Sequence, residues 1–345
     1  MNNKIIIAID AMGGENSPSK NIEGISIFLK KNFNKKDFFF NLYGDESLII
    51  KELEKFKISK NLYKIFHSST VVSDAETPLK AIKNSKDSSM WNAINSQIVH
   101  NSNITLSAGN TGVLFVVSRM LLKTIDTVSK PALAGLWPNE KNMNVVLDLG
   151  ANVECDDKNL IDFAEMGAAL YKALFPHEFA KVALLNIGSE EIKGTENLKK
   201  AHAKLKDISK YGDFQFDGFI EGNKITKGDS NVIVTDGFTG NIALKTAEGT
   251  VKFITDALKK SLTETILAKF SILFSYFALK KFKAKLDPRK FNGAIFLGLE
   301  GPVVKSHGAT DAVGFYYSID LCYRIMKGDL MSKIKNNLSH GSIKK

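Results

Sequence analysis

The chain has 345 residues, of which 44% are hydrophobic, enough to bury a full core in one large domain or two lobes. Its two cysteines, Cys155 and Cys322, lie in neither a CxxC motif nor Cys/His ligand spacing. This argues against a disulfide framework or a structural zinc site and fits a reducing cytoplasm. The formal net charge of +10 gathers in residues 251–290, where ten Lys and Arg residues stand against three acidic ones. We therefore expect one basic surface rather than a protein that coats nucleic acid.

The first third of the chain alternates strand and helix patterns. Residues 5–9 form an apolar run that Asp10 closes, which is too short for a signal peptide and predicts a first strand. Gly13 and Gly14 then predict a turn. Further strands are predicted over 38–43 and 62–66, and helices over 22–29, 46–56 and 88–100. The polar segment 67–80 is expected to lie over the carboxyl ends of the strands.

The rest of the chain continues the alternation. Strands are predicted over 132–137, 144–149, 181–187, 216–220 and 231–235, with a helix over 160–174 between them. This order predicts the α/β class, as a doubly wound three-layer fold with a parallel sheet and a single catalytic domain spanning 1–345. Ligands of such sheets bind outside the carboxyl ends of the strands, and we expect all the polar turns at that one edge.

The stretch 231–248, NVIVTDGFTGNIALKTAE, predicts a strand, a turn over 236–241 and a helix from residue 242. A helix N-terminus has unpaired N–H groups and the positive end of the helix dipole, so it favours the binding of an anion. Gly237 and Gly240 leave the backbone open to a phosphate, and Thr239 and Asn241 add donors. ITLSAGNTGVLFVVSR, at 104–119, repeats the design, which suggests one site built from several loops. The alternative for each turn alone is an ordinary strand-to-helix connection.

Two further residues lie in polar turns that follow strands. Lys193 is in the loop 188–196, where the ordinary interpretation is a solvated lysine. His307 is in the Gly-flanked turn of VVKSHG, where the ordinary interpretation is a surface or core histidine. Nucleotide P-loop, dinucleotide-binding, HExxH and GxSxG motifs are not found in the sequence, and no paired metal-ligand cluster appears. We expect neither a metal nor a cofactor.

Residues 262–285, LTETILAKFSILFSYFALKKFKAK, are expected to form an amphipathic helical insertion. The lysine-free part, 270–279, has ten residues, whereas a bilayer-spanning helix needs about twenty. An aromatic stretch bordered by lysines can instead lie in an anionic membrane surface. The candidate membrane contacts are Phe270, Phe274, Phe277, Lys280 and Lys281. A buried dimer-interface helix and a docking face for another protein remain open alternatives.

Six motifs together resemble the phosphate acyltransferases of bacterial phospholipid synthesis, over nearly the whole chain. They are AIDAMGG (8–14), SAGNTG (107–112), LDLGANV (147–153), NIGSEEIKG (186–194), VTDGFTGNIALKTAEG (234–249) and GPVVKSHG (301–308). The family usually continues the first motif as GGDHAP, whereas this chain has Glu15 and Asn16 in GGENSP.

The resemblance implies a reversible reaction in which inorganic phosphate takes a long-chain acyl group from acyl carrier protein, giving acyl phosphate. It also implies a homodimer in the cytoplasm, held peripherally on the inner face of the cytoplasmic membrane. A membrane glycerol-3-phosphate acyltransferase is expected to receive the product. The implied fold is similar to that of isocitrate and isopropylmalate dehydrogenases, without their nicotinamide or metal.

Such a reaction needs positioning more than acid–base help, because phosphate is largely dianionic near neutral pH and a thiolate leaves readily. Amides of 109–112 and 237–241 are predicted to bind phosphate, while Lys193 or Asn241 faces the developing oxyanion. The candidate catalytic residues are Lys193, Asn241 and His307. The candidate phosphate-binding residues are Asp10, Gly13, Gly14, Ser107, Gly109, Asn110, Thr111, Asn152, Asp236, Gly237, Thr239 and Gly240.

Three other functions compete with this interpretation. A phosphate acyltransferase that uses short acyl groups of coenzyme A would share fold and reaction, but would not need the hydrophobic segment 262–285. A catalytically inactive membrane scaffold would not need the polar turns. A metal-dependent hydroxy-acid dehydrogenase would share the fold, but no carboxylate cluster or nucleotide motif supports it.

Overall fold

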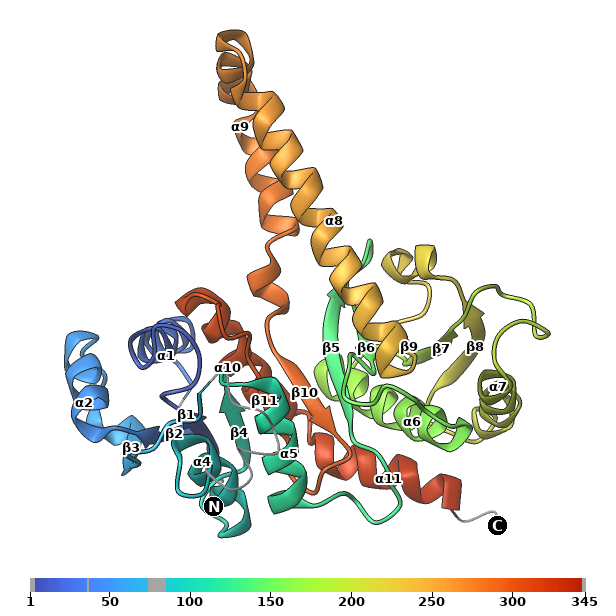
Figure 1. The fold of residues 1–345 in the computed structure, drawn as a ribbon, viewed down its shortest axis with the longest axis horizontal. Coiled ribbons are helices and arrows are strands. Elements are labelled where there is room, and N and C mark those ends of the chain that lie inside the picture. The colour runs from blue at the N-terminus through green and yellow to red at the C-terminus, as the bar shows by residue number, and fades with distance from the viewer. Residues whose placement is uncertain (1–3, 36, 74–84, 343–345) are drawn as a thin grey trace.

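The computed structural model of the chain describes residues 4–35, 37–73 and 85–342. Its strands form one 11-stranded sheet, in the order β3, β2, β1, β4, β11, β10, β5, β6, β9, β7, β8, which crosses the body of the molecule in Figure 1. The strands are β1 (Ile5–Asp10), β2 (Phe38–Gly44), β3 (Tyr63–His67), β4 (Ile104–Ser107), β5 (Ala132–Pro138), β6 (Met143–Leu147), β7 (Lys181–Leu185), β8 (Gln215–Ile220), β9 (Val232–Val234), β10 (Ala294–Leu297) and β11 (Val303–Lys305).

The helices begin at the polar caps that the local sequence provides. At the start of α6, Asp156 Oδ1 accepts a hydrogen bond from Asn159 N at 2.8 Å, and Asn159 Oδ1 accepts one from Asp156 N at 3.1 Å. The α-helices are α1 (Ser19–Lys31), α2 (Glu46–Lys55), α4 (Ser89–Ile98), α5 (Thr111–Leu122), α6 (Asp157–Leu174), α7 (Glu196–Ile208), α8 (Gly237–Thr263), α9 (Ile266–Lys285), α10 (Ala312–Lys327) and α11 (Leu330–Ser342).

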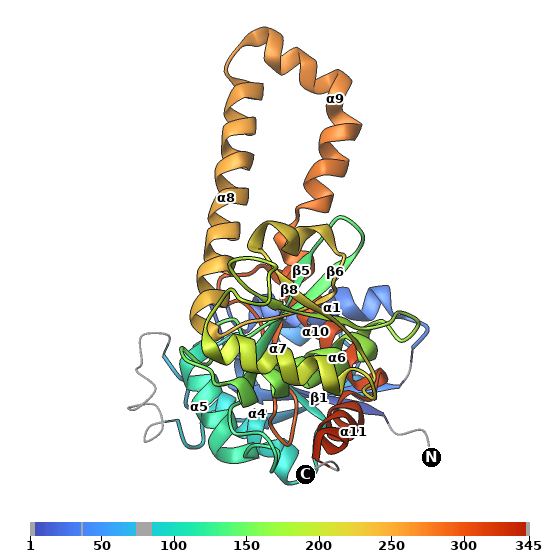
Figure 2. The same ribbon diagram turned by 90° about the vertical axis from the view of Figure 1, so that its right-hand side faces the viewer.

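Helices cover both faces of the sheet (Figure 2). One apolar cluster joins side chains such as Phe28 of α1, Phe163 of α6 and Ile319 of α10 to the strands. A second cluster joins Ile94 of α4 and Val117 of α5 to the opposite face. The prediction of an α/β three-layer fold is therefore confirmed.

The prediction of an all-parallel sheet was wrong. β3, β2, β1, β4 and β11 are parallel to one another, and so are β6, β9, β7 and β8. Three antiparallel pairings, β11 with β10, β10 with β5, and β5 with β6, reverse the direction between these two sets. The carboxyl ends of β1, β4 and β11 therefore point opposite to those of β6, β9 and β7. Hydrophobic patterning marks a strand but not its direction, which explains the error.

A hairpin of two helices, α8 and α9, projects from the body (Figures 1 and 2). Of its 27 residues, α8 buries only Gly237 and Gly240, both in its first turn. Phe274 and Phe277 of α9 are 89% and 81% exposed. The predicted insertion 262–285 includes the last residues of α8 and the whole of α9, and the projection also contains the preceding part of α8. In the described part of the chain, no helix is both long and apolar enough to span a bilayer.

The predicted polar loop 67–80 falls only partly within the described residues. Its first residue, His67, ends β3, and the chain is described as far as residue 73. The stretch with Asp74, Glu76 and Pro78 lies outside the described residues. Its predicted place over the strand ends stays a prediction.

Candidate functional site

Polar turns meet at the carboxyl ends of β1, β4 and β11. Asp10 is buried at the end of β1, and its Oδ2 accepts a hydrogen bond from the Ser107 hydroxyl at 2.7 Å. Ser107 Oγ in turn accepts from Gly109 N at 3.1 Å. Burial raises the pKa of the Asp10 carboxyl, while the hydrogen bond from Ser107 acts to lower it. The first turn cluster is the name used below for residues 10–17, 107–111 and 305–309.

The first turn cluster depends on glycine because its backbones approach closely. A Cβ atom at Gly13 would lie 2.6 Å from Asp10 Oδ2 and 2.7 Å from Gly109 N. Gly14 has a φ of +81°, and a Cβ there would lie 2.9 Å from both Ala108 O and Gly308 O. These contacts bring together the predicted residues Asp10, Gly13, Gly14, Ser107 and Gly109.

The other predicted residues of this region lie beside that centre. Asn110 caps α5 by accepting from Val113 N at 3.1 Å, and Thr111 is the first residue of the helix. His307 is exposed at the rim, where Ala309 N donates to its Nδ1 at 3.2 Å. Because Nδ1 accepts, the neutral imidazole carries its proton on Nε2, where it can donate to an anion.

A second turn cluster, residues 148–156 with 236–241, forms where β6 and β9 end. The buried carboxylate of Asp148 accepts hydrogen bonds from the backbone of Leu133, Gly150, Ala151 and Asn152, at 2.7–3.2 Å. Burial raises the pKa of Asp148, and these hydrogen bonds act against the rise. Asp148 thereby holds the turn that supports the base of α8.

The base of α8 packs directly on that turn. Gly237 N donates to Asn152 O at 2.8 Å. A Cβ atom at Gly240 would overlap Asp148 O, and one at Gly150 would lie 2.7 Å from Asn241 Nδ2. The structure thus brings together the predicted residues Asn152, Asp236, Gly237, Thr239, Gly240 and Asn241.

The helix starts earlier than the sequence indicates. The predicted turn 236–241 is helical from Gly237, with Asp236 as its N-cap. Asp236 Oδ1 accepts from Thr239 N at 2.8 Å, and Oδ2 accepts from the Thr239 hydroxyl at 2.9 Å. The start was missed because a Gly/Thr/Asn run is typical of a loop. Phosphate binding at this helix end stays a prediction, and the Asp236 carboxylate would repel the anion.

α8 links the two turn clusters. It begins in the second cluster, and Lys245 and Glu248, two turns further on, act electrostatically on His307 of the first. Desolvation lowers the pKa of His307 most, and Lys305, Lys245 and Lys20 lower it further, while Glu248 raises it. The net effect lowers the pKa of His307, which favours the neutral imidazole.

Lys193 lies in the turn between β7 and α7. Its Nζ pairs with Glu190 Oε1 at 2.9 Å, and its side chain is 44% exposed. The hydrogen bond and charge of Glu190 raise the pKa of Lys193. Within the described residues, no hydrogen bond or ion pair joins its side chain to either turn cluster. Its predicted catalytic role stays a prediction.

The sequence did not indicate two buried lysines, Lys305 in the first turn cluster and Lys20 in the adjacent helix α1. Lys20 is 6% exposed and Lys305 is 9% exposed. Lysines are seldom buried, so residue type gives no signal for either. For Lys305, the available signal was its place at the end of a β-branched run, directly before the turn that holds His307.

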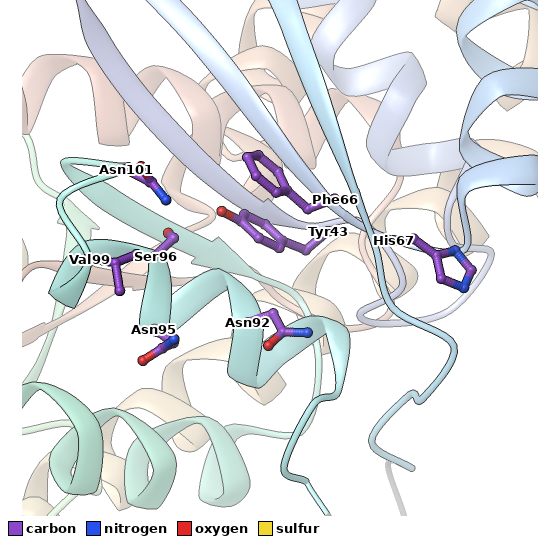
Figure 3. A pocket seen from close by; sticks show the side chains of 8 residues that line it. All are labelled: Tyr43, Phe66, His67, Asn92, Asn95, Ser96, Val99 and Asn101. Carbon is purple, nitrogen blue, oxygen red and sulfur yellow. The ribbon is translucent and has the colours of Figure 1, made fainter.

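A separate hollow of about 240 Å³ opens between α4 and the ends of β2 and β3 (Figure 3). The rings of Tyr43 and Phe66 stack there with centroids 4.8 Å apart. Asn92, Asn95 and Ser96 of α4 face it. Among the described residues that line it, none belongs to the predicted site.

The contact between Gly240 and Asp148 predicts a stability difference within one helix. Gly240→Ala should lower the free energy of unfolding by about 1–3 kcal/mol, because the added methyl overlaps Asp148 O. Gly249→Ala is the matched control, since a Cβ there meets nothing within 4 Å and should stabilise α8 by about 0.5–1 kcal/mol. Urea unfolding followed by circular dichroism measures both. Equal effects of the two changes would contradict the packing described for the base of α8.

With this geometry in view, comparisons with known proteins place the chain. A family model described as "Fatty acid synthesis protein" matches residues 5–333. The "Phosphate acyltransferase" of Pelagibacter ubique is 53% identical over 338 residues, covering 98% of this chain and 100% of that protein. That of Parvibaculum lavamentivorans is 42% identical over 339 residues, covering 98% of this chain and 92% of that protein.

Solved structures of low sequence identity share the fold. EutD phosphotransacetylase from Staphylococcus aureus matches with a TM-score of 0.60 at 12% identity, covering 94% of each chain. 4-Hydroxythreonine-4-phosphate dehydrogenase from Klebsiella pneumoniae matches with a TM-score of 0.50 at 11% identity, covering 93% of this chain and 99% of that one. The structural likeness agrees with the predicted dehydrogenase-like fold, and the sequence comparisons decide the family. The chain is an acyltransferase that belongs to the phosphate acyltransferase family.

Proposed function

We propose that the protein transfers a long-chain acyl group from acyl carrier protein to inorganic phosphate, reversibly, and so supplies acyl phosphate for phosphatidic acid synthesis. The observation that carries this proposal is α8, which links both turn clusters and continues into an exposed aromatic hairpin. The helix that starts in a polar turn cluster therefore leads directly into α9, which carries the exposed aromatic surface. Family membership supports phosphate as the acyl acceptor.

The proposed reaction has one nucleophilic step. A phosphate oxygen attacks the thioester carbonyl carbon, a tetrahedral oxyanion forms, and the carbon–sulfur bond breaks to release the carrier thiolate. The dianion needs little help from a base, so the protein mainly positions it and stabilises the oxyanion. Nε2–H of neutral His307 is suited to donate to phosphate, and the amide of Asn241, exposed beside Gly150, is suited to the oxyanion.

The hairpin supports the proposed contact with a membrane surface. Along α9, the exposed Phe274 and Phe277 come before Lys280 and Lys281, so these two lysines lie nearer the end of the helix that returns to the body. At about 1.5 Å per helical residue, the charged and aromatic groups are separated by several ångströms along the axis. This order would seat aromatic rings among lipid chains and lysines among anionic headgroups. A homodimer formed through the same hairpin is the alternative.

The hairpin's aromatic residues predict membrane binding. The double variant Phe274→Asp/Phe277→Asp should bind phosphatidylglycerol-containing vesicles at least about tenfold more weakly, because each buried phenylalanine contributes about 1.5–3 kcal/mol. Flotation with the vesicles measures the bound fraction. Phe33→Asp is the control, since Phe33 is 76% exposed on the body of the molecule. Undiminished flotation would contradict the membrane role, and if the variant also sedimented as a smaller species, the hairpin would be assigned to dimer contact.

The catalytic assignment of Lys193 predicts a large kinetic effect. Lys193→Ala should lower turnover by about 10²–10³, as expected for the loss of an oxyanion donor. Lys199→Ala is the matched control, because Lys199 pairs with Glu196 with the same sequence spacing on α7. Steady-state rates of acyl phosphate formation measure both. A loss within about threefold for Lys193→Ala, less than an oxyanion donor supplies, would remove this residue from the mechanism.

The donor is tested directly with the purified protein. Labelled inorganic phosphate with palmitoyl–acyl carrier protein should give labelled acyl phosphate, and palmitoyl–coenzyme A in a parallel reaction should give little. The expected preference follows from the hairpin, a hydrophobic surface that a small soluble donor does not need. Product from coenzyme A alone would assign the runner-up activity. No product from either donor would support a scaffold.

A further inference from the structure

The first turn cluster gathers positive charge from three separate elements. Lys20 lies in the first turn of α1, Lys305 ends β11, and Lys245 lies on α8. Lys20 and Lys305 are nearly buried, and Lys245 is exposed. The three lysines are far apart in the sequence, so only the fold brings them together.

The Lys20 ammonium sits among the turns that form the cluster. Its Nζ donates to Gly308 O. A Cβ atom at Gly14 would lie 2.9 Å from that Nζ, from Ala108 O and from Gly308 O. The group therefore lies where the turns after β1, β4 and β11 meet.

Lys305 reaches the same region from the other side of the sheet. It is paired in register with Ser107, and its Nζ donates to Ser306 O. Side chains alternate along a strand, so Lys305 shares a face with Val303, which packs in one cluster with Val113 of α5. The Lys305 side chain therefore lies on the α5 side of the sheet, and its ammonium group reaches the backbone of Ser306.

The three lysines all act electrostatically on the imidazole of His307. Lys305, Lys245 and Lys20 all lower the pKa of His307, whereas Glu248, which pairs with Lys245 at 2.8 Å, raises it. Charges in a partly buried site interact more strongly than charges in water, because the local dielectric constant is lower. The region around His307 thus has a positive potential that favours a bound anion.

The second turn cluster offers less to an anion. Asp236 places a carboxylate at the start of α8, and Thr239 N and Gly237 N already donate to acceptors of the protein. The Asp148 carboxylate lies directly behind. Each cluster holds one buried carboxyl, Asp10 or Asp148, but the first also receives the nearly buried Lys20 and Lys305, so charge favours the first.

We propose that Lys20 and Lys305 bind the phosphate substrate in the first turn cluster, with His307 donating from the rim through Nε2. This inference rests on the proposed function and adds to it the residues that hold the phosphoryl anion. The same chemistry would hold the phosphate group of the acyl phosphate product.

The test replaces each lysine by a neutral side chain of similar length. Lys305→Met and Lys20→Met should each raise the KM for inorganic phosphate by about tenfold or more, because each loses a charge-assisted contact. The KM for the acyl donor should stay within about twofold, since phosphate contacts alone are removed. Lys51→Met is the control, because Lys51 is exposed on α2. Lys305→Arg keeps the charge and should recover most of the loss.

A binding measurement separates this inference from the proposed reaction. Inorganic phosphate, added without any acyl donor at constant ionic strength, should raise the thermal midpoint of the parent and of Lys51→Met but not of the two lysine variants. The titration with inorganic phosphate reports on binding of the free substrate. The same titration with a short acyl phosphate reports on binding of the product. If phosphate raises the thermal midpoint but no acyl phosphate forms from the acyl donor, the proposed function is overturned and the phosphate site is kept.

An unchanged phosphate KM in both variants, with protection by phosphate retained, would overturn the site. If one variant fails to unfold cooperatively, the other lysine variant and Lys305→Arg decide the result. Loss of protection in Lys51→Met as well would also count against the proposal, because general loss of charge would then explain the effect.

Discussion

The buried Asp148 carboxylate is the interaction on which the site region depends. Its two oxygens accept hydrogen bonds from consecutive backbone N–H groups of the turn after β6 and from Leu133 of β5. A carboxylate is costly to bury, and hydrogen bonds of this kind offset that cost. The turn that they hold leaves no space for a Cβ atom at positions 237 and 240, so only glycine fits there at the base of α8. The turn held by Asp148 therefore decides which residues can pack at the base of α8, while Asp236 caps its first turn.

That helix matters because the sheet reverses direction in its middle. β5 and β10 run antiparallel to their neighbours, so the two sets of polar turns do not lie along one edge. α8 begins in one set and carries Lys245 and Glu248 toward His307 in the other. The predicted site residues are consequently divided between two parts of the sheet.

The two turn clusters differ in how they use charged side chains. In the second, carboxylates organise backbone and cap a helix, which is a structural use of negative charge. In the first, lysines from α1 and β11 surround turns that glycine keeps open. A reaction of a dianion with a thioester needs fixed positive potential and preorganised donors more than a strong base. The first cluster has that character, and the exposed aromatic residues Phe274 and Phe277 lie on α9, the second helix of the hairpin.

The sequence by itself determined the local elements, the α/β class and the residues of the glycine turns, because these depend on apolar period, turn chemistry and short motifs. Gly13, Gly14, Ser107 and Gly109 were identified before their contacts were known. Strand direction and the burial of Lys20 and Lys305 were decided by the tertiary structure alone. Each of these depends on pairing or packing between residues far apart in the chain, and local patterns carry no record of such partners. Residue type alone predicts that a lysine is exposed to solvent. Only the surrounding fold can bury it and make it part of a site.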